Sequence, residues 1–231
     1  MDAITFLEND HKKVEGLFAR FEKLTPRAVK TMRDLSEQII RELAVHAAIE
    51  EQVFYPAVRK CVPEADFNVL ESLEEHHVVK WTLSELDGMD PQHERFRAKM
   101  TVLIESVRHH VEEEQGELFP KVRKALDRQA LADLGEALES AKALAPTRPH
   151  PKAPDEPPGN LANVGVALLD KARDAGRSAV REAGKKAKGA ADKAKDAGKS
   201  ASAKTSGKGG GKGKKSKGSG RSGGGKKKSR A

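Results

Sequence analysis

The chain has 231 residues, which is enough for one or two domains of ordinary size, and 34% of them are charged while only 4% are aromatic. The net charge of +8 divides into −8 over residues 1–145 and +16 over residues 146–231, where 23 Lys and Arg face 7 Asp and Glu. One cysteine excludes an internal disulfide, and no apolar run approaches the roughly 20 residues that a membrane-spanning helix needs.

The N-terminal residues and the single cysteine predict the compartment in which the protein is found. The first 24 residues contain no continuous apolar segment and so predict no signal peptide, and the lone thiol of Cys61 fits a reducing compartment. We therefore expect a soluble cytoplasmic protein without a membrane partner. The basic second part favours contact with a polyanion.

Residues 1–145 predict a succession of amphipathic helices. The apolar face of the first recurs at steps of three and four once His11 is included: Ile4, Leu7, His11, Val14, Phe18 and Phe21. Thr25-Pro26 has the form of a cap and first helical residue and predicts the start of the second helix, which ends near Val62-Pro63. A third helix is expected over about 66–86. Asp90-Pro91 predicts the start of a fourth helix, and a shorter one is expected over about 128–144.

This pattern predicts the fold class. Four long helices with short links favour an all-α, up-and-down antiparallel four-helix bundle over residues 1–145, and no segment of useful length alternates as a strand would. Six prolines in residues 146–160 predict a stiff linker. Residues 161–203 repeat an Ala- and Lys-rich unit at an offset of 22 and predict a marginal helix, and residues 204–231 predict a disordered basic tail.

Each of the four long helices carries an imidazole at an apolar-face position. The second and fourth helices add a carboxylate four residues later on the same face. The side chains that interrupt the apolar faces are His11, His46, Glu50, His76, His110 and Glu114. Burying them unpaired would cost several kcal/mol. Imidazole and carboxylate together suit iron, manganese or zinc, and six ligands exceed the needs of one four-coordinate zinc.

The spacing of these residues indicates an internal duplication. His11 to His46 spans 35 residues and His76 to His110 spans 34, and each of the two later histidines has Glu four residues on and Pro ten residues on. The chain therefore has the form of two helix pairs, each supplying half of one centre.

The repeated pattern of His, then His-x-x-x-Glu, resembles the hemerythrin (HHE cation-binding) family over about residues 1–125. The resemblance implies two iron ions, oxo- or hydroxo-bridged, with His11, His46, Glu50, His76, His110 and Glu114 as the metal ligands. It also implies that dioxygen or a related small ligand, such as nitric oxide or peroxide, binds at an open position. Binding or sensing is favoured over an enzyme that removes peroxide or nitric oxide, because no acid–base residue is visible beyond the ligands.

The sequence departs from the oxygen-carrying members of that family at one position. Those proteins place two histidines one turn apart on the third helix, whereas Lys80 stands four residues after His76. This departure argues against simple oxygen carriage. We expect His77, His109, Glu51 and Glu113 to face solvent, because their helix faces are mostly polar, and we expect Tyr55 and Trp81 to be packing residues.

The basic tail allows two interpretations. Lysines spread along a disordered segment neutralise phosphates without reading bases, so the tail predicts DNA binding and association with the nucleoid. The iron domain would then lie on DNA, and an iron-binding protein that protects the nucleoid from iron-driven oxidation is an alternative function. The tail resembles those of linker histones and some bacterial nucleoid proteins, and its repeat is similar to desiccation-related helical repeats. The alternative is a solubilising appendage without a partner.

Overall fold

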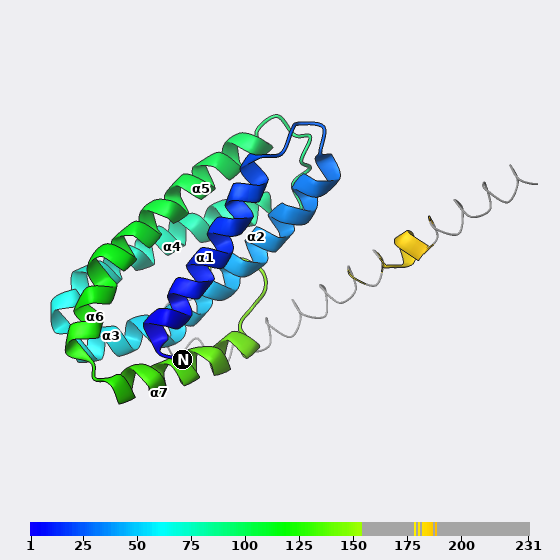
Figure 1. Cartoon of the computed structure of the whole chain (residues 1–231). Coiled ribbons are helices and arrows are strands. Elements are labelled where there is room, and N and C mark those ends of the chain that lie inside the picture. The colour runs from blue at the N-terminus through cyan, green and yellow to red at the C-terminus, as the bar shows by residue number, and fades with distance from the viewer. Residues whose placement is uncertain (154–177, 179, 181, 187, 189–231) are drawn as a thin grey trace, which may run out of the picture. The chain divides into compact units, whose positions relative to one another are not determined.

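The computed structural model describes residues 1–153, 178, 180, 182–186 and 188 (Figure 1). All regular structure in this part of the chain is helical, so the prediction of an all-α fold is confirmed for it. None of the described helices is both long and apolar enough to cross a membrane. Most of the predicted helical segment at 161–203 and the whole tail at 204–231 lie outside the described residues.

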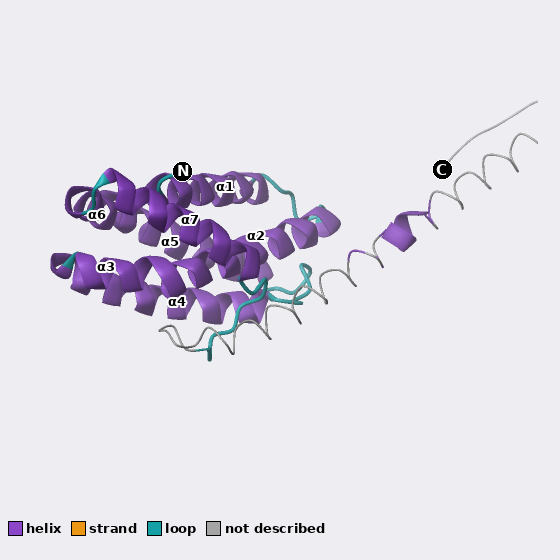
Figure 2. Cartoon of the chain, turned by 90° about the horizontal axis from the view of Figure 1, so that it is seen from below, coloured by secondary structure: helices purple, strands orange, loops and turns teal. Residues whose placement is uncertain are grey.

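Long helices lie side by side in pairs (Figure 1 and Figure 2). In one pair α1 packs on α2, and in the other α4 packs on α5, while α7 packs against α1 and α2. Short helices α3 and α6 continue α2 and α5 after a π-helical turn. The bounds are α1 Ala3–Glu22, α2 Val29–Ile49, α3 Tyr55–Cys61, α4 Asp66–Leu86, α5 Phe96–Glu113, α6 Phe119–Ala125 and α7 Arg128–Leu144.

Two helices begin later than the sequence predicts. Helix α2 begins at Val29, because Pro26 lies in a turn that the Ala28 N–H closes on the Thr25 carbonyl. Asp90-Pro91 likewise opens a turn before α5, in which the Asp90 carboxylate accepts from the Gln92 N–H and its carbonyl accepts from the His93 N–H. Both sites show that the same residue types that cap a helix also stabilise a turn.

A π-helical turn follows the ligand-bearing part of each pair's second helix, at Glu50–Phe54 and at Glu114–Leu118. A π turn holds one residue more than an α turn, so it shifts the buried face by one position. The regular helical spacing that puts His46 and Glu50 on the buried face would put Val53 and Ala57 there as well. The structure instead buries Phe54 and Val58, and Val53 and Ala57 are half-buried.

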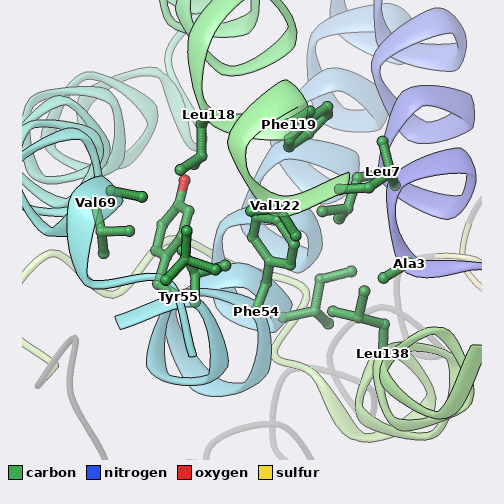
Figure 3. Close-up of a cluster of buried hydrophobic side chains, with 14 of the residues drawn as sticks. Ala3, Leu7, Phe54, Tyr55, Val69, Leu118, Phe119, Val122 and Leu138 are labelled. Atoms are coloured by element: carbon green, nitrogen blue, oxygen red, sulfur yellow. The ribbon is translucent and has the colours of Figure 1, made fainter. Parts of the chain in front are cut away.

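The apolar core is divided into two clusters. One cluster joins α3, α6 and α7 with the start of α1, and Figure 3 shows Phe54, Phe119 and Leu138 within it. The other cluster lies towards the opposite end and includes Phe18, Phe21, Ile39, Leu83, Phe96 and Met100. The predicted metal ligands fall between residues of the two clusters along every long helix: Leu7 precedes His11 in one cluster, and Val14 follows it in the other.

Residues 146–153 do not form a free linker. Arg148 is only 6% exposed and forms an ion pair with Asp87 at 2.5 Å. This stretch lies beside Ala44, Ala48 and Lys80, on the seam between α2 and α4. The remainder of the expected linker, residues 154–160, lies outside the described residues.

Gly135 provides a test of how α7 packs. A Cβ at this position would overlap the Met1 carbonyl oxygen and lie 3.0 Å from the Ala3 nitrogen. We expect Gly135→Ala to lower the free energy of unfolding by about 1–3 kcal/mol because α7 must shift away from α1. Gly16→Ala is the control: it lies in helix α1 with nothing within 4 Å, and it should raise the same free energy by about 1 kcal/mol in a denaturant titration.

Candidate metal centre

The structure brings together all six side chains that the sequence singled out. His11 comes from α1, His46 from α2, His76 from α4 and His110 from α5, and none is more than 6% exposed. Glu50 and Glu114 begin the two π turns and are 0% and 1% exposed. Each π turn therefore starts at a carboxylate that points into the bundle.

The four histidines form two pairs through their Nε2 atoms. Nε2 of His11 lies 2.9 Å from Nε2 of His46, and Nε2 of His76 lies 3.1 Å from Nε2 of His110. The pairing follows the duplication, because each helix pair contributes one imidazole pair. Two groups of ligand atoms meet within 4.8 Å: His11, His46, Glu50 and Glu114 in one, and Glu50, His76 and His110 in the other.

The two carboxylates connect the imidazole pairs. An oxygen of Glu50 lies 3.2 Å from Nε2 of His46 and 3.4 Å from Nε2 of His76. An oxygen of Glu114 lies 3.3 Å from Nε2 of His11 and 3.5 Å from Nε2 of His110. Each carboxylate therefore reaches one imidazole of both pairs.

The donor atoms fit a metal. Both oxygens of Glu50 and one of Glu114 are buried without a hydrogen-bond partner among the described residues. Buried acceptors in this condition are costly, and a cation at the centre would satisfy them. Imidazole nitrogen with carboxylate oxygen is a donor set that suits iron, manganese and zinc.

Three of the four outward Nδ1 atoms have hydrogen-bond partners of their own. Glu51 contacts His76 at 3.1 Å, Glu75 contacts His110 at 2.7 Å and the Gln115 amide contacts His11 at 2.9 Å. A carboxylate of Asp10 lies 3.7 Å from Nδ1 of His46, beyond hydrogen-bond length. Each partner sits next to a predicted ligand in the sequence and reaches an imidazole on a different helix. Such contacts fix which ring nitrogen faces a metal.

Glu51 is not solvated, which corrects the sequence prediction. It is 6% exposed, because it contacts His76 with one oxygen while the other accepts from Nζ of Lys80 at 2.9 Å. Lys80, the residue that departs from the oxygen-carrying pattern, is itself 8% exposed. The Lys80–Glu51 pair therefore lies directly behind one imidazole of the centre.

Tyr55 is the site residue whose role the sequence analysis missed. It is buried within the apolar cluster (Figure 3). Its hydroxyl donates to Glu114 at 2.9 Å and lies 3.3 Å from Nε2 of His76. The duplication offered a signal, since Tyr55 stands nine residues after His46 and its counterpart Phe119 stands nine residues after His110. Trp81, expected to pack, is 49% exposed. His77 and His109 are exposed, as predicted.

The two central carboxyls differ in proton affinity. Burial raises the pKa of Glu50 well above its usual range, and the charge of Glu114 raises it further. Burial acts on Glu114 in the same direction, but the nearby His110 and His11 lower its pKa below the usual range. Burial also lowers the pKa of His46 to about 4. Without a metal, the centre therefore favours one protonated and one ionised carboxyl.

Comparison with known proteins agrees with this geometry. The family described as "Hemerythrin HHE cation binding domain" matches residues 2–122. The chain is 29% identical over 167 residues to an uncharacterized hemerythrin-like protein of Schizosaccharomyces pombe, covering 71% of this chain and 81% of that protein. It is 28% identical over 134 residues to a protein named DNA nickase from Nostoc sp., covering 58% of this chain but only 37% of that protein.

A solved structure shares the fold. A hemerythrin HHE cation-binding domain-containing protein from Mycobacterium kansasii superposes with a TM-score of 0.54 at 19% identity, covering 62% of this chain and 86% of that one. At this identity, the likeness concerns the path of the helices.

In the metal-free protein at neutral pH, we expect the Glu50 carboxyl to lower the free energy of unfolding. Its raised pKa means that its contribution to stability is present below the ordinary carboxyl pKa of 4.5 and is lost as pH rises through the raised value. We expect Glu50→Gln to raise the free energy of unfolding of the metal-free protein by about 1–3 kcal/mol at pH 7, measured by urea titration. The gain should shrink toward pH 4.

Glu51→Gln, one residue along, is the matched control. It should lower the same free energy by about 3 kcal/mol, because it leaves Lys80 buried without its partner carboxylate. A destabilised Glu50→Gln protein at pH 7 would contradict the cost assigned to that carboxyl.

Proposed function

Because the chain belongs to the hemerythrin family of HHE cation-binding domains, we propose that it is a non-haem di-iron protein that binds or senses dioxygen or a related small molecule, such as nitric oxide or peroxide. Domains of this family bind metal ions, typically iron. One observation carries the proposal: Glu50 and Glu114 each reach both imidazole pairs, which is what two neighbouring ions bridged by carboxylates require.

In this proposal each helix pair of an up-and-down antiparallel bundle holds one ion. His11 and His46 would hold the first ion and His76 and His110 the second, and Glu50 and Glu114 would be ligands to both. An oxo or hydroxo group would complete the centre. Ferrous iron, when bound, supplies the electrons with which dioxygen or a related ligand is held or reduced.

The protein's own residues orient and shield the centre. Glu51 and Glu75 accept from Nδ1–H of His76 and His110, which leaves Nε2 of each ring free to bind a metal. Tyr55 donates to Glu114 and so fixes one carboxylate oxygen. The apolar clusters cover this layer on either side along the bundle.

The geometry also supports the second candidate, an enzyme that removes peroxide or nitric oxide. By sequence alone this candidate ranks lower, because no acid–base residue is visible beyond the ligands. The Tyr55 hydroxyl supplies a proton donor 2.9 Å from Glu114. Burial and the charges of Glu114 and Glu50 raise the pKa of this phenol well above its usual range, so it keeps its proton at neutral pH.

We also infer that the basic part of the chain binds DNA and places the iron domain there. Its support is the net charge of +16 over residues 146–231. The chain is also similar, over 134 residues, to the protein named DNA nickase. Lysine-rich segments bind the phosphate backbone without reading sequence.

Metal analysis tests the central proposal. The protein purified in air, or reconstituted anaerobically with ferrous iron, should contain about two irons per chain and show near-ultraviolet bands of an oxo bridge. His46→Ala and His110→Ala should each lose at least half of the iron, because each removes one member of an imidazole pair. His77→Ala and His109→Ala, whose side chains are exposed, should retain it.

A folded protein that takes up no iron under either condition would refute the di-iron proposal. The same samples separate binding from catalysis. A binding or sensing protein returns to its starting spectrum after oxygen is removed, whereas an enzyme consumes added peroxide over many cycles. Tyr55→Phe should slow the second behaviour and leave iron content unchanged.

A gel-shift assay at low salt tests the tail. Because residues 146–153 pack on the bundle, the deletion should begin at residue 154. We expect the full chain to shift duplex DNA of any sequence, the shift to weaken as salt rises, and deletion of residues 154–231 to abolish it. An unchanged shift after the deletion would exclude the tail as the DNA-binding segment.

A further inference from the structure

A cavity of about 340 Å³ lies beside the four histidines, at the seam between α1 and α5. All four imidazoles border it, and its walls are otherwise mostly apolar: Val14, Phe18, Leu43, Ala47, Val79 and Val107. A further hollow of about 250 Å³ follows along the same seam and shares Arg108. The seam between α1 and α5 is therefore open over much of its length.

The duplicated sequence offers an internal comparison for this opening. The relation that exchanges the helix pairs maps the seam between α1 and α5 onto the seam between α4 and α2. At that second seam the backbones approach closely, and the hollow measures only about 30 Å³. Residues 146–153 also lie over it. One approach to the metal centre is thus closed and the other is open.

The residues at equivalent positions explain the difference. At the closed seam, Ala44 stands two residues before His46 and Ala48 stands two residues after it, and small side chains let helices approach. At the open seam the equivalent residues on α5 are Arg108 and Glu112, which are too large to lie between two helices. The sequence therefore accounts for the difference between the open and the closed seam.

Arg108 frames the mouth of the cavity. Its guanidinium makes two hydrogen bonds to Glu15 at 2.8–2.9 Å and two to Glu22 at 2.8–3.0 Å, and it lies 5.9 Å over the Phe18 ring. Lys12 also lines the cavity, so the two carboxylates of Glu15 and Glu22 offset the charges of two cations. The mouth is therefore polar but carries no excess positive charge at Arg108. This charge balance favours an uncharged ligand over an anion.

The size of the cavity exceeds the needs of a diatomic ligand. A water molecule takes about 30 Å³ in the liquid, and an apolar cavity of about 150 Å³ is enough to bind benzene. A volume of about 340 Å³ lies within the range of sites for organic molecules. An apolar space of this size lowers stability unless a ligand uses it.

We propose that the cavity beside the centre binds an uncharged organic molecule of the organic hydroperoxide or alcohol class, with a compact apolar body and one oxygen head group. The molecule enters between α1 and α5 past Arg108, its body lies against Val14, Phe18 and Val107, and its oxygen reaches the imidazole layer. This inference rests on the proposed function, because it assigns the inner end of the cavity to the metal ions.

Titration calorimetry with 2-phenyl-2-propanol, an unreactive alcohol of this class, tests the proposal. The probe is titrated into the full chain as purified, with iron measured in the same sample, and again after chelation. We expect saturable binding in both, because the walls belong to the protein. Val107→Phe and Val14→Phe, which fill the cavity from α5 and from α1, should each weaken binding at least tenfold. Val102→Phe, the same change at an exposed position of α5, should not.

Absence of saturable binding, or equal affinity in the Val107→Phe, Val14→Phe and Val102→Phe proteins with circular dichroism unchanged, would overturn the proposal. The iron measurement keeps the two hypotheses apart. A chain that holds iron but does not bind the alcohol would sink this inference and leave the proposed function standing. A chain that binds the alcohol without ever taking up iron would refute the proposed function and leave the cavity as a binding site.

Discussion

The burial of two carboxylates and four imidazoles in one layer is the constraint on which the rest of the structure depends. This layer separates two apolar clusters, and none of its six side chains is more than 6% exposed. Glu50 and Glu114 retain buried oxygens without a partner in the described part of the chain. Without a metal, the buried polar atoms of this layer lower the stability of the bundle, and the same atoms suit a cation. This combination is typical of a site whose geometry serves binding rather than folding.

Local irregularities support this layer. A π turn begins at each central carboxylate and shifts the buried face of the residues that follow it by one position. Phe54 and Phe119 therefore pack in the apolar cluster that joins α3, α6 and α7 with the start of α1. The residue after each carboxylate, Glu51 or Gln115, then contacts an imidazole of the other helix pair. A single turn of unusual helix thus positions a ligand, a partner for a second ligand and part of the core.

The two halves of the duplication have diverged in ways that make the centre unsymmetrical. Tyr55 places a hydroxyl against Glu114, whereas its counterpart Phe119 stacks on His11 without a polar atom. Lys80 forms a buried pair with Glu51 at the closed seam, whereas its counterpart Glu15 binds Arg108 at the mouth of the open one. Two positions for metal ions in such a layer would differ in proton supply and in access.

The sequence by itself determined the helices, the duplication and the six inward-facing donors, because helical periodicity and ligand spacing are local and survive without knowledge of neighbours. Only the tertiary structure decided which imidazoles pair, that Glu51 is buried with Lys80, that Tyr55 reaches Glu114, and that one seam is open. These features depend on distances between helices and on the one-residue shift of each π turn. A prediction from periodicity assumes that helices are regular and evenly spaced. It therefore cannot reveal a π turn or a difference in the distance between helices.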